Sequence, residues 1–301
     1  MNGVLVVDKP SGMTSHDVVD IVRRLARTRR VGHTGTLDPL ATGVLVLLVG
    51  PATRLSRFVT ESTKVYRGVV RFGETTTTYD ADGEIVERWP VDLDLATVRA
   101  LLPHFHGEIL QIPPAYAAVK VRGKRAYALA RQGHEVALEP RPVTIHTIEV
   151  LKWNSPDLTI EVVCSPGTYI RSLAHDLGQK AGSGAHLLGL RRTATGHFTL
   201  EDARTIEGLE ELRAEGRFAE ALLPPHAALS DMPMVALTPA EEQVVRYGQV
   251  VALEPPGNPD RLQAHNQAGQ LVAVLRRLED GSYRPILVLT PSIDEAGDSR
   301  A

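Results

Sequence analysis

The stretch RRVGHTGTLDPLATGVLVLLVG, Arg29–Gly50, places one acidic residue, Asp38, in a short turn just before an apolar run. The run, Val44–Val49, is continuously hydrophobic and predicts a strand buried in the core. Asp-Pro is a common turn former, so a purely structural role for Asp38 is one interpretation. However, Gly35 and Gly43 flank the acid, as happens where the backbone bends sharply or lets a ligand come close. A rigidly held carboxylate can serve there as a nucleophile or a general base, so Asp38 is also the first catalytic candidate.

The composition is typical of a soluble globular protein. The 301 residues are enough for one large domain or two, with 23% charged and 43% hydrophobic residues. No apolar run reaches the roughly 18–20 residues of a membrane span, and the N-terminus lacks the features of a signal peptide. The single cysteine, Cys164, excludes an internal disulfide and a cysteine-based zinc cluster. We therefore expect a cytoplasmic protein that does not enter a membrane.

Charge is distributed unevenly along the chain. Residues 1–71 carry eleven Lys and Arg against five acidic residues, a net charge of +6. Residues 201–301 carry nine against seventeen, a net charge of −8. The basic segment Arg23–Arg30 is suited to contact phosphate. A solvated face of a basic helix explains the same charges, and charge alone does not separate the two interpretations.

Hydrophobic periodicity predicts strands and helices that alternate irregularly. We expect a helix after Thr14, which can cap it together with Asp17, and a strand over Lys64–Phe72 with Tyr66 on its apolar face. The other expected elements are a strand at Gly3–Val7, a loop at Gly73–Glu84, a helix at Ala96–Leu102 stopped by Pro103, a helix from about Arg125, a strand at Leu158–Cys164 and a helix at Thr168–Leu177. This order favours an α+β fold around a mixed sheet over a doubly wound one.

The character of the sequence changes near Leu223–His226. Short β-like runs then follow one another with little helix between them, at Gln249–Leu253, Leu262–His265, Leu271–Leu278 and Pro285–Leu289. We therefore predict a larger domain over residues 1–228, a small β-rich domain over residues 229–292 and a disordered tail over residues 293–301.

Three further residues have both a structural and a functional interpretation. Tyr66 suits the core, where aromatic side chains on an apolar strand face usually lie, but it also offers a stacking surface for a nucleobase. Tyr169 and Arg171 belong to the strand-to-helix turn CSPGTYIR, a kind of turn where side chains often converge on a site. Arg171 is suited to a forked pair with a buried carboxylate, or it is a surface residue in the first turn of a helix.

The sequence offers little that would hold a metal or a cofactor. His104 and His106 have no third ligand at a familiar spacing, and His16 and His33 stand apart from them. There is no P-loop, no GxGxxG after a strand and no GxSxG. We predict neither a metal nor a cofactor.

Six segments occur in a characteristic order: DKPSGMTSHDVV from Asp8, GHTGTLDPLATGVL from Gly32, KVYRGVVRFGETTTTYDADGE from Lys64, QIPPAYAAVKVRGKRAYALARQG from Gln111, CSPGTYIRSLAHDLG from Cys164 and GAHLLGLRRTATG from Gly184. Over residues 3–206 the chain thereby resembles the TruB family of tRNA pseudouridine synthases, which isomerise uridine 55 in the T arm. The resemblance implies the pseudouridine synthase fold, a mixed and mostly antiparallel central sheet flanked by helices. The C-terminal region resembles a small PUA-type RNA-binding domain. One departure is Ala117, where the family has serine.

The resemblance also assigns roles to individual residues. Asp38 matches the catalytic aspartate and Arg171 matches the arginine that pairs with it. In this family the target base is flipped out of the RNA and into the site. Tyr66 is expected to stack on that base and is a candidate for removing its C5 proton, and Tyr169 and Leu190 are expected to lie against it. His33 is expected to fill the space that the base leaves in the RNA. The cations expected to contact the RNA backbone are Lys9, Arg29, Arg30, Lys64, Arg67, Lys120, Arg191 and Arg192.

This interpretation expects a monomer that binds tRNA through its T arm and isomerises the target without an external reagent. Attack by Asp38 on C6 of the uracil, attack on C1′ of the ribose and removal of the C2′ proton all stay open. Two other classes are a non-catalytic RNA-binding or RNA-chaperone protein, which the presence of Asp38, Tyr66 and Arg171 opposes, and a glycosidic hydrolase. The hydrolase needs two acids flanking the bond. Asp80 and Asp82 fall in the polar loop, so no second acid is assigned.

Overall fold

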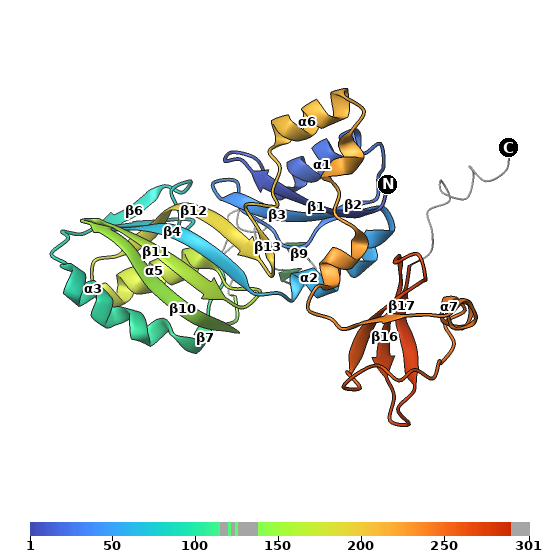
Figure 1. The fold of residues 1–301 in the computed structure, drawn as a ribbon. Coiled ribbons are helices and arrows are strands. Elements are labelled where there is room, and N and C mark those ends of the chain that lie inside the picture. The colour runs from blue at the N-terminus through green and yellow to red at the C-terminus, as the bar shows by residue number, and fades with distance from the viewer. Residues whose placement is uncertain (115–119, 122–123, 126–137, 290–301) are drawn as a thin grey trace.

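The N-terminal three quarters of the chain build one long twisted sheet (Figure 1). The computed structural model describes residues 1–114, 120–121, 124–125 and 138–289. Within these ranges the strands of the long sheet are β1 (Gly3–Lys9), β2 (Val31–His33), β3 (Thr42–Val49), β4 (Lys64–Phe72), β7 (Gly107–Gln111), β10 (Arg141–Asn154), β11 (Asp157–Cys164), β12 (Ala185–Thr195) and β13 (Phe198–Thr199).

The strand order is β1-β3-β12-β4-β11-β10-β7, with β2 beside β3 and β13 beside β12. Among the described residues, neighbouring strands of this sheet run antiparallel except β3 and β12, which run parallel. The predicted α+β class with a mixed, mostly antiparallel central sheet is therefore confirmed. The one parallel pair matters for the site, because it sets the residues after the Asp38 turn beside Arg191 and Arg192.

Helices flank this sheet along its length. Its helices are α1 (Ser15–Leu25), α2 (Ser56–Thr60), α3 (Leu95–Leu101), α5 (Ile170–Ala181) and α6 (Ile206–Ala214), whereas α7 (Pro239–Arg246) packs on the separate C-terminal sheet. The 3₁₀ turns are η1 (Gly50–Leu55), η2 (Leu102–Phe105), η3 (Phe218–Ala221) and η4 (Pro225–Leu229). α1 and α6 contact β2 and β1, whereas α5 packs on β4 and β12 (Figure 1). The Thr14–Asp17 capping box predicted for α1 is present. None of the helices in the described ranges is long and apolar enough to cross a bilayer.

β1 and β3 are buried on both faces, which explains why their sequences are continuous apolar runs rather than alternating ones. Leu5 and Leu47 pack on one face together with Val18 of α1. On the other face, Val4 and Val46 join a cluster that extends into the C-terminal region of the chain. The Asp38 turn therefore leads directly into β3, a strand that is fixed from both sides.

The C-terminal region forms a separate four-stranded sheet, as the short β-like runs predicted (Figure 1). Its strands, in the order β14-β15-β16-β17, are β14 (Met234–Ala236), β15 (Arg261–His265), β16 (Leu271–Arg277) and β17 (Tyr283–Val288). The expected strand at Gln249–Leu253 is wrong, since only Val251 makes a bridge, to Tyr283. The division at residues 228 and 229 stays a prediction and falls inside η4. The predicted tail lies outside the described residues.

Three other expectations meet different outcomes. The segment expected as a loop contains β5 (Glu74–Thr76), which pairs with β6 (Ile85–Arg88), because Thr75 and Thr76 pack inward. α3 ends at Leu101, before Pro103, which lies in the first turn of η2, where its missing N–H is tolerated. The helix expected from about Arg125 lies outside the described residues. Before it, β8 (Lys120–Val121) and β9 (Lys124–Arg125) form a short hairpin.

Candidate active site

A tightly fixed loop between β2 and β3 carries Asp38. Ser15, at the start of α1, donates from its hydroxyl to the carbonyl of Leu37 at 3.0 Å and accepts from the Leu37 amide at 2.8 Å. On the other side of Asp38, the buried ammonium of Lys9 donates to the carbonyl of Pro39 at 3.3 Å. Both neighbours of the acid are thus tied to the core, while 35% of the Asp38 side chain stays exposed. The turn holds the carboxylate in place and leaves it open to the cavity described below.

Arg192 of β12 holds the beginning of the same loop. Its Nε donates to the carbonyl of Val44 at 2.7 Å, its Nη2 to that of Gly35 at 3.0 Å and its Nη1 to that of Thr36 at 3.4 Å. Gly43 has φ +99, and a Cβ there would lie 2.2 Å from the carbonyl oxygen of Arg192. Only glycine allows this approach, which explains one of the glycines that flank Asp38.

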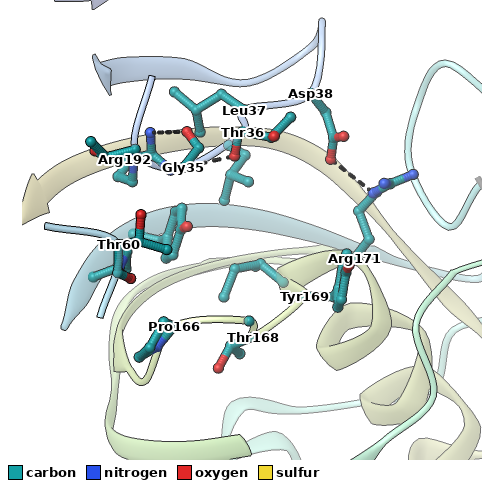
Figure 2. A pocket seen from close by; sticks show the side chains of 16 residues that line it. Gly35, Thr36, Leu37, Asp38, Thr60, Pro166, Thr168, Tyr169, Arg171 and Arg192 are labelled. Carbon is teal, nitrogen blue, oxygen red and sulfur yellow. Dashed lines mark hydrogen bonds and ion pairs between the residues drawn. The ribbon is translucent and has the colours of Figure 1, made fainter. Parts of the chain in front are cut away.

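Arg171 reaches Asp38 from the opposite wall. The turn after β11 leads into α5, whose first turn holds Arg171. Its Nε lies 3.0 Å from Oδ2 of Asp38, and Figure 2 marks this ion pair with a dashed line. Its Nη1 lies 3.3 Å from Oδ2 of Asp80 and donates to the carbonyl of Thr78 at 3.2 Å. A cation at a helix N-terminus is disfavoured by the helix dipole, and here two carboxylates offset that cost.

The carboxyl group of Asp38 is harder to ionise than an ordinary aspartate. Burial raises its pKa above the ordinary 3.8, the Arg171 guanidinium opposes this shift, and the nearby charge of Asp80 adds to it. The predicted Asp38–Arg171 pair is present, but it does not cancel the effect of burial on the pKa. A carboxylate with a raised pKa is a stronger base, which suits a catalytic role.

Asp38 and Arg171 form one end of a cavity of about 240 Å³. Tyr66 of β4, Leu190 of β12 and Tyr169 at the start of α5 also line it, and Figure 2 shows Tyr169 beside Arg171. Only 9% of Tyr66 is exposed, and burial raises the pKa of its hydroxyl. Aromatic and aliphatic walls beside one carboxylate suit a flat heteroaromatic ring presented for attack or proton transfer.

Comparison with known families decides which protein family uses this arrangement. The TruB family pseudouridylate synthase (N terminal domain) matches residues 23–170, and the tRNA pseudouridylate synthase B C-terminal domain matches residues 171–232. The chain belongs to the TruB family. The two matches meet inside the active site, between Tyr169 and Arg171. They end before the C-terminal sheet, so its likeness to a PUA domain stays a prediction.

Relatives of this TruB-family chain are similar over nearly its whole length. The tRNA pseudouridine synthase B of Solibacter usitatus is 45% identical over 297 residues, covering 96% of this chain and 100% of the relative. That of Thermobifida fusca is 46% identical over 300 residues, covering 97% and 99%. A chain from the structure of an H/ACA RNP bound to a substrate RNA containing 2′-deoxyuridine has a TM-score of 0.73 at 25% identity, covering 96% of this chain and 85% of that one. The likeness of fold confirms the predicted pseudouridine synthase architecture.

The TruB-family site gathers most, but not all, of the predicted residues. The cavity is lined by Asp38, Tyr66, Tyr169, Arg171 and Leu190. His33 is absent from this lining. It ends β2, opposite Leu47, and its neighbour Thr34 lines the cavity instead. The role predicted for His33 stays a prediction. Among the described residues, no three His, Cys, Asp or Glu side chains lie close enough to share a metal ion.

Two residues that position this site were missed from the sequence. Asp80 was assigned to a polar loop, yet only 4% of its side chain is exposed. The Asp80 carboxylate accepts hydrogen bonds from the Thr78 hydroxyl and, at 3.2 Å, from the Asp82 amide, so its position does not depend on Arg171 alone. Gln111 is buried in β7 and its amide bonds both backbone groups of Tyr169, at 2.7 and 2.9 Å. The hydroxyl-rich run TTTTYDADG was the available signal for Asp80, since it can satisfy a buried carboxylate.

Burial contradicts a surface role for three of the cations predicted to contact the RNA backbone. Lys9 and Lys64 donate to backbone carbonyls, and burial lowers the pKa of each to about 8. Arg192 is buried against the Asp38 loop. Lys64 and Arg192 line the cavity rather than the outer surface. The contact of these three cations with the RNA backbone stays a prediction, while their charge already holds the protein's own loops.

The remaining predicted cations differ in what they already contact. Arg29 and Arg30 are exposed, and their contact with RNA stays a prediction. Arg67 lies 2.7 Å from Glu161, and Arg191 makes a forked pair with Asp8 at 2.7 and 3.0 Å. These two would have to exchange a carboxylate for a phosphate. The side chain of Lys120 lies outside the described residues.

Proposed function

We propose that this protein isomerises uridine 55 in the T loop of tRNA to pseudouridine, as a cytoplasmic monomer that needs no metal or cofactor. The observation that carries the proposal is the carboxylate of Asp38, held 3.0 Å from Arg171 at the end of an aromatic-lined cavity. Membership of the TruB family and the relatives named tRNA pseudouridine synthase B support tRNA as the substrate. The position of the target uridine follows from the resemblance of the motifs.

The cavity explains why the target base must leave the RNA stack. A base stacked inside a folded loop cannot reach a carboxylate in a recess of this size, so it is flipped out, at a cost of a few kcal/mol. Tyr66 stacks on the flipped ring and Leu190 contacts its other edge, which offsets part of that cost. Tyr169, fixed by Gln111, closes the wall beside the base.

The reaction breaks the N1–C1′ bond, turns the uracil and forms a C5–C1′ bond. The C5 proton then leaves and N1 gains a proton, so atoms and electrons balance without a reductant or an oxidant. Asp38 starts the reaction by attack at C6 or at C1′ or by removing the C2′ proton. Arg171 stays close to the carboxylate throughout and stabilises its charged form. The phenolic oxygen of Tyr66 is the candidate that receives the C5 proton, with its own hydroxyl proton passed on to solvent in the same step.

Glycosidic hydrolysis is the competing function, because the structure brings a second carboxylate near Asp38. Asp80 shares Arg171 with it. However, Asp80 does not line the cavity and only 4% of its side chain is exposed, so it cannot flank a bound glycosidic bond.

Release of tritium from tRNA that carries [5-³H]uridine tests the proposal. We expect one tritium released per tRNA, with the RNA chain and the base both retained. A matched tRNA with cytidine in place of uridine 55 should release none. Free uracil in the supernatant would indicate a hydrolase, and equal release from both RNAs would place the target elsewhere.

A further inference from the structure

Tyr79 lies between two groups that contact the same nitrogen of Arg171. The carbonyl of Thr78 accepts from Nη1 at 3.2 Å, and Oδ2 of Asp80 lies 3.3 Å from the same atom. The φ of Tyr79 is +63, in the left-handed region that bulky side chains rarely adopt. The unusual conformation thus falls at the point where the chain turns to present both of its neighbours to one guanidinium.

Backbone hydrogen bonds hold the Tyr79 turn to β12. The Tyr79 amide donates to the carbonyl of Thr76 at 3.2 Å, and its carbonyl accepts from the Leu187 amide at 3.0 Å. The Ala81 amide donates to the carbonyl of Leu187, also at 3.0 Å. These bonds fix the turn against the sheet. They do not fix it against α5, the helix that carries Arg171.

A stacked pair of rings makes the connection to α5. The ring of Tyr79 lies almost parallel to the imidazole of His175, with 3.8 Å between the ring centroids and 11° between the planes. His175 follows Arg171 by four residues, so both lie on one face of α5. A strained backbone conformation persists where the surrounding structure holds it. The stack supplies such a contact, one helical turn from the atoms that Asp80 meets.

His175 contributes a flat neutral ring rather than a polar contact. Among the described residues, its buried Nδ1 has no hydrogen-bond partner. Burial lowers the pKa of His175, which favours the neutral form and avoids a second positive charge close to Arg171. In the described part of the chain, the lining of the Asp38 cavity includes neither Tyr79 nor His175. Neither ring is therefore placed to touch a bound base.

We propose that Tyr79 and His175 are positioning residues for the isomerisation. Their stacked rings hold the Asp80 turn against α5, so that Arg171 stays fixed beside the Asp38 carboxylate. This rests on the proposed function, which gives Asp38 its reaction. Because the two rings act through Asp80 and Arg171, their loss should lower kcat and leave tRNA affinity unchanged.

The test removes and restores the stack from each side. Tyr79→Leu and His175→Leu each remove one ring, whereas Tyr79→Phe and His175→Phe keep two rings that can stack. The matched control is His197→Leu, which removes an imidazole that lies 3.9 Å from the Phe198 ring and does not line the Asp38 cavity. Tritium release at saturating tRNA gives kcat per molecule that binds tRNA, counted by stoichiometric titration, so unfolded protein does not enter the result.

We expect each leucine variant to lose about tenfold in kcat, as a small displacement of a catalytic group does. The dissociation constant for tRNA should stay that of wild type. Both phenylalanine variants should recover most of kcat, and His197→Leu should match wild type. Tyr79→Gly separates strain from stacking, because glycine adopts a positive φ freely. It should lose as much as Tyr79→Leu. Wild-type kcat for Tyr79→Gly would mean that the stack only offsets the strain of Tyr79 itself, and would overturn the proposal.

Two further measurements separate positioning from a general structural defect. In an Asp80→Asn background, Tyr79→Leu should cause no further loss of kcat, because the group through which it acts is already changed. Losses that multiply would overturn the proposal. The Nε–H NMR signal of Arg171, assigned by its absence in Arg171→Lys, should move in both leucine variants without RNA and stay in place in His197→Leu. An unmoved signal in both leucine variants overturns the proposal. If the wild-type protein releases no tritium, the proposed function fails, and this signal still decides whether the stack positions Arg171.

Discussion

Positive charge is used in opposite ways in the two sheets of this molecule. In the catalytic sheet the charges are satisfied inside: Arg171 bridges two carboxylates and Arg192 donates to three carbonyls. In the C-terminal sheet Arg261, Arg276 and Arg284 face solvent without carboxylate partners among the described residues. The net charge of a segment therefore does not tell which of its cations are enclosed and which face solvent. The basic N-terminal region uses much of its charge to build the site, and the acidic C-terminal region still presents free cations.

The largest expected effect comes from changing Asp38, the carboxylate that pairs with the buried Arg171. Asp38→Asn keeps the shape of the side chain but removes both the nucleophile and the base. We expect turnover to fall by about 10³-fold or more, measured by tritium release at saturating tRNA. Binding of tRNA should change little. Turnover within tenfold of wild type would remove Asp38 from the reaction.

The same variant tests the direction of the Asp38 pKa. Because burial raises this pKa above the unfolded value of 3.8, the folded state holds the proton more tightly than the unfolded state does. The contribution of Asp38 to stability therefore falls as pH rises from below 3.8 through the folded pKa, and at neutral pH its buried charge is a cost. Asp38→Asn should unfold at neutral pH with a midpoint temperature equal to or above that of wild type. A lower midpoint would mean that the pair with Arg171 outweighs burial.

Asp80→Asn should have the next largest effect, although Asp80 does not line the cavity. It leaves Arg171 with one carboxylate instead of two, so we expect the guanidinium to shift and turnover to fall by about 10²-fold. Removing the Asp80 charge also removes one cause of the raised Asp38 pKa. The acidic limb of the pH–rate profile should therefore move to lower pH. A structural defect alone would lower the amount of folded enzyme and leave that limb in place.

The difference between local and long-range contacts explains how far the sequence could predict this site. The strands at Gly3–Val7 and Val44–Val49 and the Thr14 cap were predictable, because each depends on neighbouring residues. The pairing of Asp38 with Arg171 followed from the motif resemblance rather than from periodicity. Asp80 was missed because its burial depends on a long-range contact, the bridge between Asp80 and Leu187. The alignment of Arg261, Arg276 and Arg284 was hidden for the same reason, since these residues meet only through strand register.

Arg192→Gln should mainly cost stability. Glutamine cannot reproduce three charged hydrogen bonds to the loop, so we expect the free energy of unfolding to fall by about 3 kcal/mol in urea denaturation. The matched control is Arg191→Gln, whose half-exposed pair with Asp8 should contribute less than about 1 kcal/mol. Equal losses for the two variants would mean that the carbonyl contacts do not hold the loop. High salt should not change the result for Arg192, since buried charges are poorly screened.

We expect the smallest effect for Arg67. Its side chain is exposed, as are those of the C-terminal arginines, but it is paired with a carboxylate, as Arg171 is. Its side chain is 58% exposed and lies 2.7 Å from Glu161, its register neighbour on β11. An exposed pair of this kind contributes little, so Arg67→Gln should lower the free energy of unfolding by less than about 0.5 kcal/mol. Because Glu161 already occupies the guanidinium, we also expect tRNA affinity to change less than about threefold and the salt slope to stay constant. The informative comparison is Glu161→Gln, which frees Arg67 without removing it. If that variant binds tRNA more tightly and with a steeper salt slope, and Arg67→Gln reverses the gain, RNA passes over this part of β4 and the ion pair weakens its binding. If neither variant changes affinity, RNA does not pass over this part of β4, and the position of a cation on the molecule, rather than its partner, decides whether it binds the substrate.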